Sequence, residues 1–229
     1  LLEDVTHFIH PDFWTLELEL KYGIKDRFKE VMEQIIAALN FVKSMDYLSA
    51  YSKQKKVFTS HEGLLLALES AATRYVDDQK KFYNLSSHLL WIGDRTHALD
   101  SAHVEYFRGI QNPIGIKIGP VFDPQEITEV IKTLNPLDEE GRIVLIHRFG
   151  EKHILRCLPL LLDAVLESKL NVCWLCDPMH GNTMKTNKHI KTRRYQDILE
   201  ETKLALSIHR DYQVPLGGVH FELTGEDVT

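Results

Sequence analysis

After about residue 55 the sequence alternates regularly between short apolar segments and longer amphipathic segments. The short segments have the length and β-branched composition of strands, and the longer ones repeat apolar residues at helical spacing. Strands that alternate with helices become parallel strands joined by right-handed crossovers, so we predict an α/β fold. Six strands are expected, at residues 56–60, 88–92, 114–118, 142–147, 171–176 and 218–223.

Two of the intervening helices are well defined by the sequence. One begins at Asp123-Pro124-Gln125-Glu126, which supplies an N-cap, a proline at the first helical position and an acidic residue three positions after the cap. Both helices carry an apolar face that we expect to be buried: Ile127, Val130, Ile131 and Leu134 in the first, and Ile154, Leu155, Leu158, Leu161, Leu162 and Val165 in the second.

The first part of the chain differs from the rest. Residues 26–42 repeat apolar side chains at helical spacing with Lys, Glu and Gln between them, which predicts one long amphipathic helix. We therefore divide the chain into a helical segment, 1–55, lying outside or between barrel strands, and a barrel portion, 56–229, that carries the active-site face.

Composition excludes several classes of protein. With 229 residues, 44% hydrophobic and 26% charged, the chain has the composition of a globular protein rather than a disordered one. A net charge of −6 argues against general binding to nucleic acid or to anionic membranes. The apolar runs are shorter than the roughly 20 residues that cross a bilayer. Three cysteines favour a reducing compartment, and we expect a cytoplasmic location.

Two α/β architectures are compatible with the alternation. A doubly wound sheet usually carries a glycine-rich phosphate loop, and neither GxGxxG nor GxxxxGK[ST] occurs in the sequence. A (β/α)8 barrel instead places its chemistry at the carboxyl ends of several strands. Charged residues follow nearly every predicted strand here, which favours the barrel.

Three cations lie at or just after successive strands: Arg95, Lys117 and Arg148. Guanidinium and ammonium groups that converge on one point suit a carboxylate or a phosphate. The alternative is that each cation pairs with a nearby acid.

A second group consists of His180, Glu222 and His220. Imidazole nitrogen and carboxylate oxygen together suit a divalent metal. Residues two apart on a strand share a face, so His220 and Glu222 point the same way. His220 is therefore either a further ligand or a supporting residue, and the spacing leaves both open.

Two further features have competing interpretations. Cys173 and Cys176 resemble a CxxC pair but face opposite sides of a strand, so we expect both to be small core residues, as we do for Cys157 on a helix. The basic segment 185–194 is either a solvated loop or a lid that contributes cations to a phosphorylated substrate.

Several longer motifs carry a family resemblance. They are Thr59-Ser60-His61-Glu62, Trp91-Ile92-Gly93-Asp94-Arg95-Thr96, Asn112-Pro113-Ile114-Gly115-Ile116-Lys117, Cys176-Asp177-Pro178-Met179-His180-Gly181-Asn182-Thr183 and Leu223-Thr224-Gly225-Glu226-Asp227-Val228-Thr229. In these motifs, and in their order, the chain resembles the type II, or plant-like, 3-deoxy-D-arabino-heptulosonate-7-phosphate (DAHP) synthases. The resemblance is dense from about residue 59 to the end and weaker before it.

The resemblance implies a function. The family condenses phosphoenolpyruvate with erythrose 4-phosphate and water, giving DAHP and phosphate in the first step of the shikimate pathway. It implies a (β/α)8 barrel, a divalent metal such as Mn²⁺ or Co²⁺, and a homo-oligomer in the cytoplasm or a plastid. By motif, Asp94, Arg95, Lys117 and Arg148 correspond to phosphoenolpyruvate-binding positions, and His180 and Glu222 to metal ligands. Arg95, Lys117 and His180 are the expected catalytic residues.

The sequence also departs from the family. Asp94 stands where Glu is usual, and His147 where Ser or Thr is usual. Counterparts of a cysteine ligand, of a further phosphoenolpyruvate-binding arginine and of an aspartate ligand are missing. We therefore expect a fragment that covers barrel strands three to eight of an enzyme, and the sequence leaves open whether this fragment is active alone. Two alternatives are a synthase that uses another aldehyde acceptor and a degenerate paralogue that binds without turnover.

Overall fold

The computed structural model describes residues 57–187 and 189–222. The chain divides into two units, Leu1–Phe58 and Thr59–Thr229. The helical segment predicted at 1–55, including the helix at 26–42, lies outside the described residues, as does the motif at 223–229. The following account concerns the second unit.

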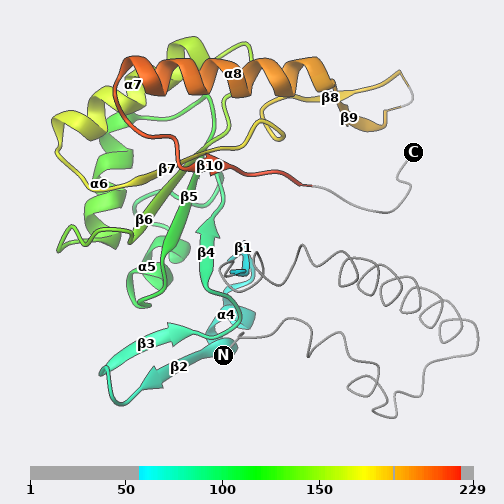
Figure 1. The fold of residues 1–229 in the computed structure, drawn as a ribbon. Coiled ribbons are helices and arrows are strands. Elements are labelled where there is room, and N and C mark those ends of the chain that lie inside the picture. The colour runs from blue at the N-terminus through cyan, green and yellow to red at the C-terminus, as the bar shows by residue number, and fades with distance from the viewer. Residues whose placement is uncertain (1–56, 188, 223–229) are drawn as a thin grey trace, which may run out of the picture. The chain divides into compact units, whose positions relative to one another are not determined.

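The second unit is built on a single six-stranded sheet in which every strand pairs in parallel with its neighbours (Figure 1). The strands lie in chain order, as in consecutive β/α units of a barrel, and they form a half-barrel. The predicted α/β class with six parallel strands is confirmed. In sheet order they are β1 (Ser60–Glu62), β4 (Leu89–Ile92), β5 (Ile114–Ile118), β6 (Ile143–His147), β7 (Cys173–Cys176) and β10 (Gly218–Val219).

The predicted strand bounds are accurate in the centre of the sheet and less accurate at its edges. β5 has the predicted bounds and all five of its residues are buried, as expected for an apolar strand covered on both faces. β1 begins at Ser60, so the strand predicted at 56–60 is placed too early. β10 ends at Val219, although the backbone N–H of His220 still donates to the carbonyl of Cys176 on β7 at 2.7 Å. Edge strands have one partner instead of two, so pairing fixes their ends less firmly.

Five helices occur in the described part of the chain, and each comes after a strand of the main sheet, in β/α order (Figure 1). α5, α6, α7 and α8 pack side by side in that order. None of the described helices is long and apolar enough to cross a membrane. The helices are α4 (Leu66–Ala72), α5 (Ala102–Arg108), α6 (Pro124–Leu134), α7 (Ile154–Glu167) and α8 (Tyr195–Asp211).

The two helices predicted from sequence form with few changes. In α6 the Asp123 side chain accepts a hydrogen bond from the backbone N–H of Gln125 at 2.9 Å, which confirms the N-cap. All four predicted apolar residues of α6 are buried. In α7 the prediction is wrong for Leu155, which is 64% exposed. The buried side chains of α7 recur three, four and seven positions after Ile154, so the adjacent Leu155 points away from the sheet.

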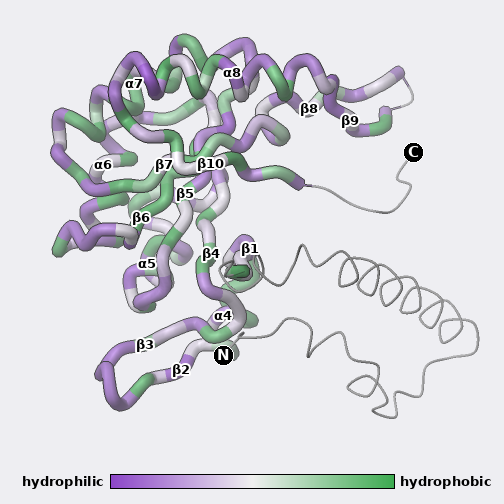
Figure 2. The backbone as a smooth tube through the Cα atoms, in the orientation of Figure 1, coloured by the Kyte–Doolittle hydropathy of each residue, from purple (hydrophilic) through white to green (hydrophobic). Residues whose placement is uncertain are grey.

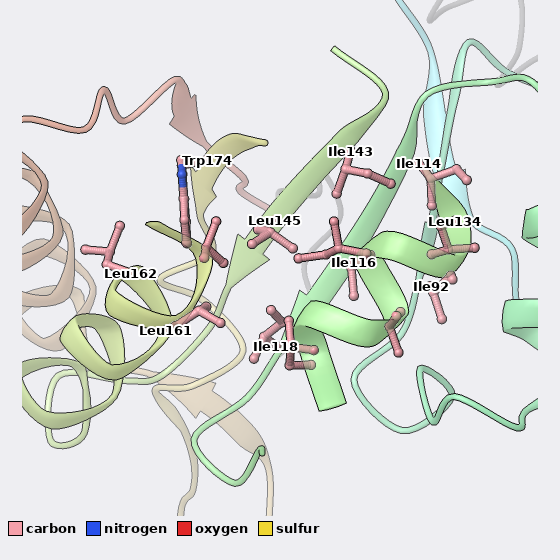
Figure 3. Packing of buried hydrophobic residues seen from close by; sticks show 14 of the residues in the cluster. Ile92, Ile114, Ile116, Ile118, Leu134, Ile143, Leu145, Leu161, Leu162 and Trp174 are labelled. Carbon is pink, nitrogen blue, oxygen red and sulfur yellow. The ribbon is translucent and has the colours of Figure 1, made fainter. Parts of the chain in front are cut away.

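The hydrophobic core lies between the sheet and α5 to α8. Figure 3 shows Ile92, Ile116, Ile118 and Leu145 of the strands near Leu134 and Leu161 of the helices. Figure 2 shows hydrophobic residues alternating with hydrophilic ones along α7 and α8, as expected for helices with one buried face. The core therefore holds the sheet against these helices.

Two antiparallel hairpins accompany the main sheet: β2 (Thr73–Val76) with β3 (Lys81–Asn84), and β8 (Thr183–Lys185) with β9 (Lys191–Arg193). In the basic segment at 185–194, Lys185 belongs to β8 and Lys191–Arg193 form β9, whereas the other described residues of the segment belong to no strand. Among the cysteines, Cys157 and Cys176 are buried as predicted, but Cys173 is exposed because it faces away from the core at the start of β7.

Candidate active site

The carboxyl ends of the strands surround a cavity of about 900 Å³. Five cationic side chains and three carboxylates line it, so the cavity suits an anionic ligand. The structure brings together there the residues predicted from sequence for the anion and metal sites, with the exception of His220. Its lining residues are Glu62, Leu64, Gly93, Asp94, Arg95, Thr96, Lys117, Arg148, His180, Thr183, Lys191, Arg193 and Glu222.

Lys117 projects from β5 and is almost completely buried. Its ammonium group lies 2.5 Å from Oδ2 of Asp177 and 5.3 Å from the ring centre of Trp91. The interpretation that a cation pairs with a nearby acid is therefore correct for Lys117, although the same side chain also lines the cavity. The pairing holds the ammonium group in a fixed position at the cavity wall.

Asp177 follows β7 and connects the two predicted groups of residues. Its carboxylate is fully buried and also accepts a hydrogen bond from Nδ1 of His180 at 2.7 Å. Backbone N–H groups of Met179 and His180 donate to its other oxygen at 3.0 and 3.1 Å. Burial alone would raise the pKa of Asp177, but the hydrogen bonds from His180 and Lys117 outweigh it and hold the pKa well below its usual value. The carboxylate is therefore ionised at neutral pH.

The geometry of His180 and Glu222 fits a metal site. Nε2 of His180 lies 3.1 Å from Oε1 of Glu222. When Nδ1 donates to Asp177, a neutral imidazole has its lone pair on Nε2, next to the carboxylate oxygen. Two lone-pair donors at this separation can bind one cation, and a carboxylate behind the ligating histidine is the usual support for such a ligand. These two residues could hold a divalent metal.

Arg148 follows β6 and is held by Asp94, which follows β4. Nη1 of Arg148 lies 2.6 Å from Oδ2 of Asp94, and the other oxygen of Asp94 accepts the backbone N–H of Gly119. Nε of Arg148 is buried with no hydrogen-bond partner among the described residues. Like Lys117, Arg148 therefore pairs with an acid, but its Nε–H makes no hydrogen bond to the described residues.

Three other cations contribute to the cavity. Arg95 is exposed and makes no ion pair with any residue in the described part of the chain. Lys191 and Arg193 come from β9, and Nε of Arg193 donates to the carbonyl of Met179 at 2.8 Å. The basic hairpin therefore supplies cations to the cavity wall.

His220 packs against Trp91, with ring centres 4.9 Å apart in an edge-to-face arrangement. Burial, followed by the nearby Lys117 charge, lowers the pKa of His220. Of the two interpretations left open by the spacing, the packing favours a supporting position, because the ring lies against the indole beneath Lys117.

Sequence reasoning missed Asp177 as a site residue. It selected cations, histidines and Glu222 at strand ends and passed over the acid between Cys176 and Pro178. The available signal was its position directly after β7, three residues before His180.

The chain is similar in sequence to a group of aldolases. Residues 2–229 match the family model described as the Class-II DAHP synthetase family. A phospho-2-dehydro-3-deoxyheptonate aldolase of Neurospora crassa is 42% identical over 96% of this chain and 49% of its own length. An aldolase of the same name from Streptomyces coelicolor is 42% identical over 89% of the chain and 45% of its own length. Phospho-2-dehydro-3-deoxyheptonate aldolase AroG of Mycolicibacterium smegmatis is 35% identical over 97% of the chain and 49% of its own length. The chain spans about half the length of these curated relatives.

Proposed function

The chain belongs to the Class-II DAHP synthetase family, and we propose that the protein it forms condenses phosphoenolpyruvate with erythrose 4-phosphate to give DAHP and phosphate. The observation that carries the proposal is the connection through Asp177, because one buried carboxylate holds both Lys117 at the anion site and His180 at the metal site. The reaction needs an anionic substrate and a divalent metal side by side.

Lys117, Arg148 and Arg95 are proposed to bind the carboxylate and phosphate of phosphoenolpyruvate. Lys117 and Arg148 are held by Asp177 and Asp94, so little side-chain entropy is lost when the substrate binds. Held in this way, the enol carbon is oriented toward the second substrate, and orientation of this kind lowers the barrier to a bimolecular step. Asp94 acts in this scheme by positioning Arg148 rather than by attracting the anionic substrate.

His180 and Glu222 would hold the metal, Mn²⁺ or Co²⁺, with Asp177 keeping the imidazole of His180 oriented. When bound, the metal supplies Lewis acidity toward the aldehyde carbonyl of the second substrate. Lys191 and Arg193 add positive charge to the same cavity, which suits a second phosphorylated molecule.

The proposal also covers the division of the chain, its self-association and its location. The segment 56–229 would carry the active-site face and 1–55 would lie outside or between barrel strands. The family resemblance also predicts self-association and a cytoplasmic location.

A synthase with a different aldehyde acceptor is the second candidate, and its support comes from Asp94 and His147. Only Asp94 lines the cavity, whereas His147 lies on the other face of the sheet, so one of the two departures bears on substrate choice. The carboxylate of Asp94 contacts Arg148 and Gly119, and these contacts support an effect on the binding of phosphoenolpyruvate rather than on the choice of acceptor. We therefore favour erythrose 4-phosphate.

The test is an assay of phosphate release from phosphoenolpyruvate by the intact protein, including any residues that precede or follow this chain. We expect release that requires erythrose 4-phosphate, stops on addition of a chelator and returns with Mn²⁺. Release with another aldehyde alone would support the second candidate. A folded, metal-loaded protein that releases no phosphate with any aldehyde would contradict the proposal.

A further inference from the structure

A second group of chemically reactive side chains lies on the opposite face of the sheet from the cavity. His147 ends β6 and Cys176 ends β7, and the two are direct partners in the register of these strands. Side chains alternate between the faces of a strand, and Lys117 pairs with Ile146 while Ile118 pairs with His147. His147 and Cys176 therefore face the helices, where Glu201 of α8 completes the group.

The ligand atoms of this group are close together. One nitrogen of His147, the sulfur of Cys176 and one carboxylate oxygen of Glu201 all lie within 4.8 Å of one another, and all three side chains are buried. Zinc bonds of about 2.0–2.3 Å in a tetrahedral arrangement hold ligand atoms roughly 3.3–3.7 Å apart. Small side-chain rotations would bring the three atoms to that separation.

The imidazole of His147 makes no hydrogen bond to any residue that the structure describes. The residue is fully buried, and neither ring nitrogen has a partner among the described residues. Burial lowers the pKa of His147 to about 3, with a smaller contribution from His209, so the ring is neutral and retains a lone pair. A buried polar group without a partner costs free energy, and an ion or a water molecule is the usual explanation.

Glu201 is held in place as a ligand would be. Its fully buried carboxylate accepts the backbone N–H of Gly150 at 2.9 Å and the side-chain amide of Asn182 at 2.7 Å. No cation pairs with it among the residues that the structure describes, and burial raises its pKa to about 7. The hydrogen bonds orient the carboxyl group, and none of the described residues supplies a counterion for its ionised form.

We propose that His147, Cys176 and Glu201 bind a zinc-class divalent cation behind the sheet. Nitrogen, sulfur and oxygen donors together select zinc or cobalt over magnesium, calcium or manganese, which prefer oxygen ligands. The site differs from the one at His180 and Glu222, which opens into the cavity on the other face. The inference does not depend on the proposed function.

A cation at this site would fasten α8 to the ends of two central strands. Each strand-end ligand directly precedes a residue of the cavity or its support: Arg148 follows His147, and Asp177 follows Cys176. Bound metal would therefore also fix the backbone that positions both of these residues. This gives the site a structural role in support of the cavity.

The test uses Co²⁺ as a spectroscopic probe on the 229-residue chain, purified in the presence of a chelator and then freed of it. A cobalt–thiolate bond produces a charge-transfer absorption in the near ultraviolet. We expect this band to reach its full intensity when one equivalent of cobalt is bound to the buried site. Binding should release protons, because the thiol ionises. The band should disappear when Zn²⁺ replaces the cobalt.

Three variants identify the ligands. Cys176→Ser should abolish the band and weaken binding at this site by at least about 100-fold, more than the loss of an outer partner costs. Cys157→Ser is the matched control, since Cys157 is also a buried free cysteine but lies on α7, and it should keep the band. His180→Ala should also keep the band, because it alters only the cavity site.

The wild-type chain alone can overturn the proposal. A chain with native near-ultraviolet circular dichroism and no charge-transfer band would mean that water, not a metal, accompanies His147. A band that survives in Cys176→Ser, or one that disappears in Cys157→Ser, would contradict the assignment equally. If Cys176→Ser does not fold, His147→Thr takes its place, and loss of metal binding by that folded variant is then the expected result.

Discussion

Replacing Asp177 with asparagine removes the charge that connects the two halves of the cavity. Asp177 is fully buried, and the side chain of its partner Lys117 is only 7% exposed. Breaking a buried ion pair by removing one partner costs about 3–5 kcal/mol, because the remaining charge stays buried and uncompensated. We expect Asp177→Asn to lower the free energy of unfolding by that amount at pH 7.

The stability difference between wild type and Asp177→Asn should depend on pH in a definite direction. The folded-state pKa of Asp177 is depressed, so its contribution to stability is complete above the unfolded-state pKa of about 3.9 and is lost as the pH falls below it. The difference between wild type and Asp177→Asn should therefore be constant from pH 5 upward, on the order of several kcal/mol, and should narrow below about pH 4.

Urea unfolding followed by circular dichroism at several pH values measures both quantities. Asp211→Asn is the matched control, because Asp211 is 69% exposed and lies 3.9 Å from Arg210. Its replacement should change stability by less than about 0.5 kcal/mol. Equal stabilities of wild type and Asp177→Asn at pH 7, or a difference that does not narrow in acid, would refute the reasoning.

Three further substitutions test other parts of the structure. Arg148→Lys should raise the KM for phosphoenolpyruvate at least about tenfold in the intact protein, because an ammonium group cannot reproduce the planar guanidinium contact; an unchanged KM would remove Arg148 from the binding site. Gly181→Ala should destabilise the chain by about 1–3 kcal/mol in urea, since its Cβ would lie 2.8 Å from Cα of Gly150, and equal stability would show that the two loops can separate without cost. Phe107→Ala should cost about 3–5 kcal/mol because Phe107 is fully buried, whereas Phe82→Ala at a 50% exposed position should cost much less; similar losses for the two would contradict the packing described.

The central strands could be predicted closely because their sequences leave few alternatives. A run such as Ile114 to Ile118 can only be buried on both faces, and the polar segments on either side mark its ends. β1 at the edge was placed too early because Val57 and Phe58 are apolar in sequence but exposed in the structure. Apolar pattern alone does not distinguish a paired residue from an exposed one beside it.

The composition of the candidate site was also largely predictable, since strands that end at one edge bring their following residues together. Arg95, Lys117, Arg148, His180 and Glu222 all line one cavity as expected. The contacts between these residues could not be predicted. Asp177 owes its role to its contact with Lys117, which is 60 residues away in the sequence. Sequence position does not reveal which cation an acid will contact.

The contacts of His147, on the opposite face of the sheet, could not be predicted from the sequence either. In the sequence it was notable only as a departure from a family pattern, next to a predicted binding residue. Its partners Cys176 and Glu201 come from a neighbouring strand and a distant helix. Their proximity becomes visible only when register and helix packing are known.

The location of metal and substrate tests the central claim most directly. A crystal structure of the intact protein with Mn²⁺ and phosphoenolpyruvate, with anomalous scattering to identify manganese, would measure it. We predict manganese in contact with Nε2 of His180 and the carboxylate of Glu222, and substrate oxygens in contact with Lys117 and Arg148. Manganese bound away from His180, or phosphoenolpyruvate bound outside this cavity, would contradict the account.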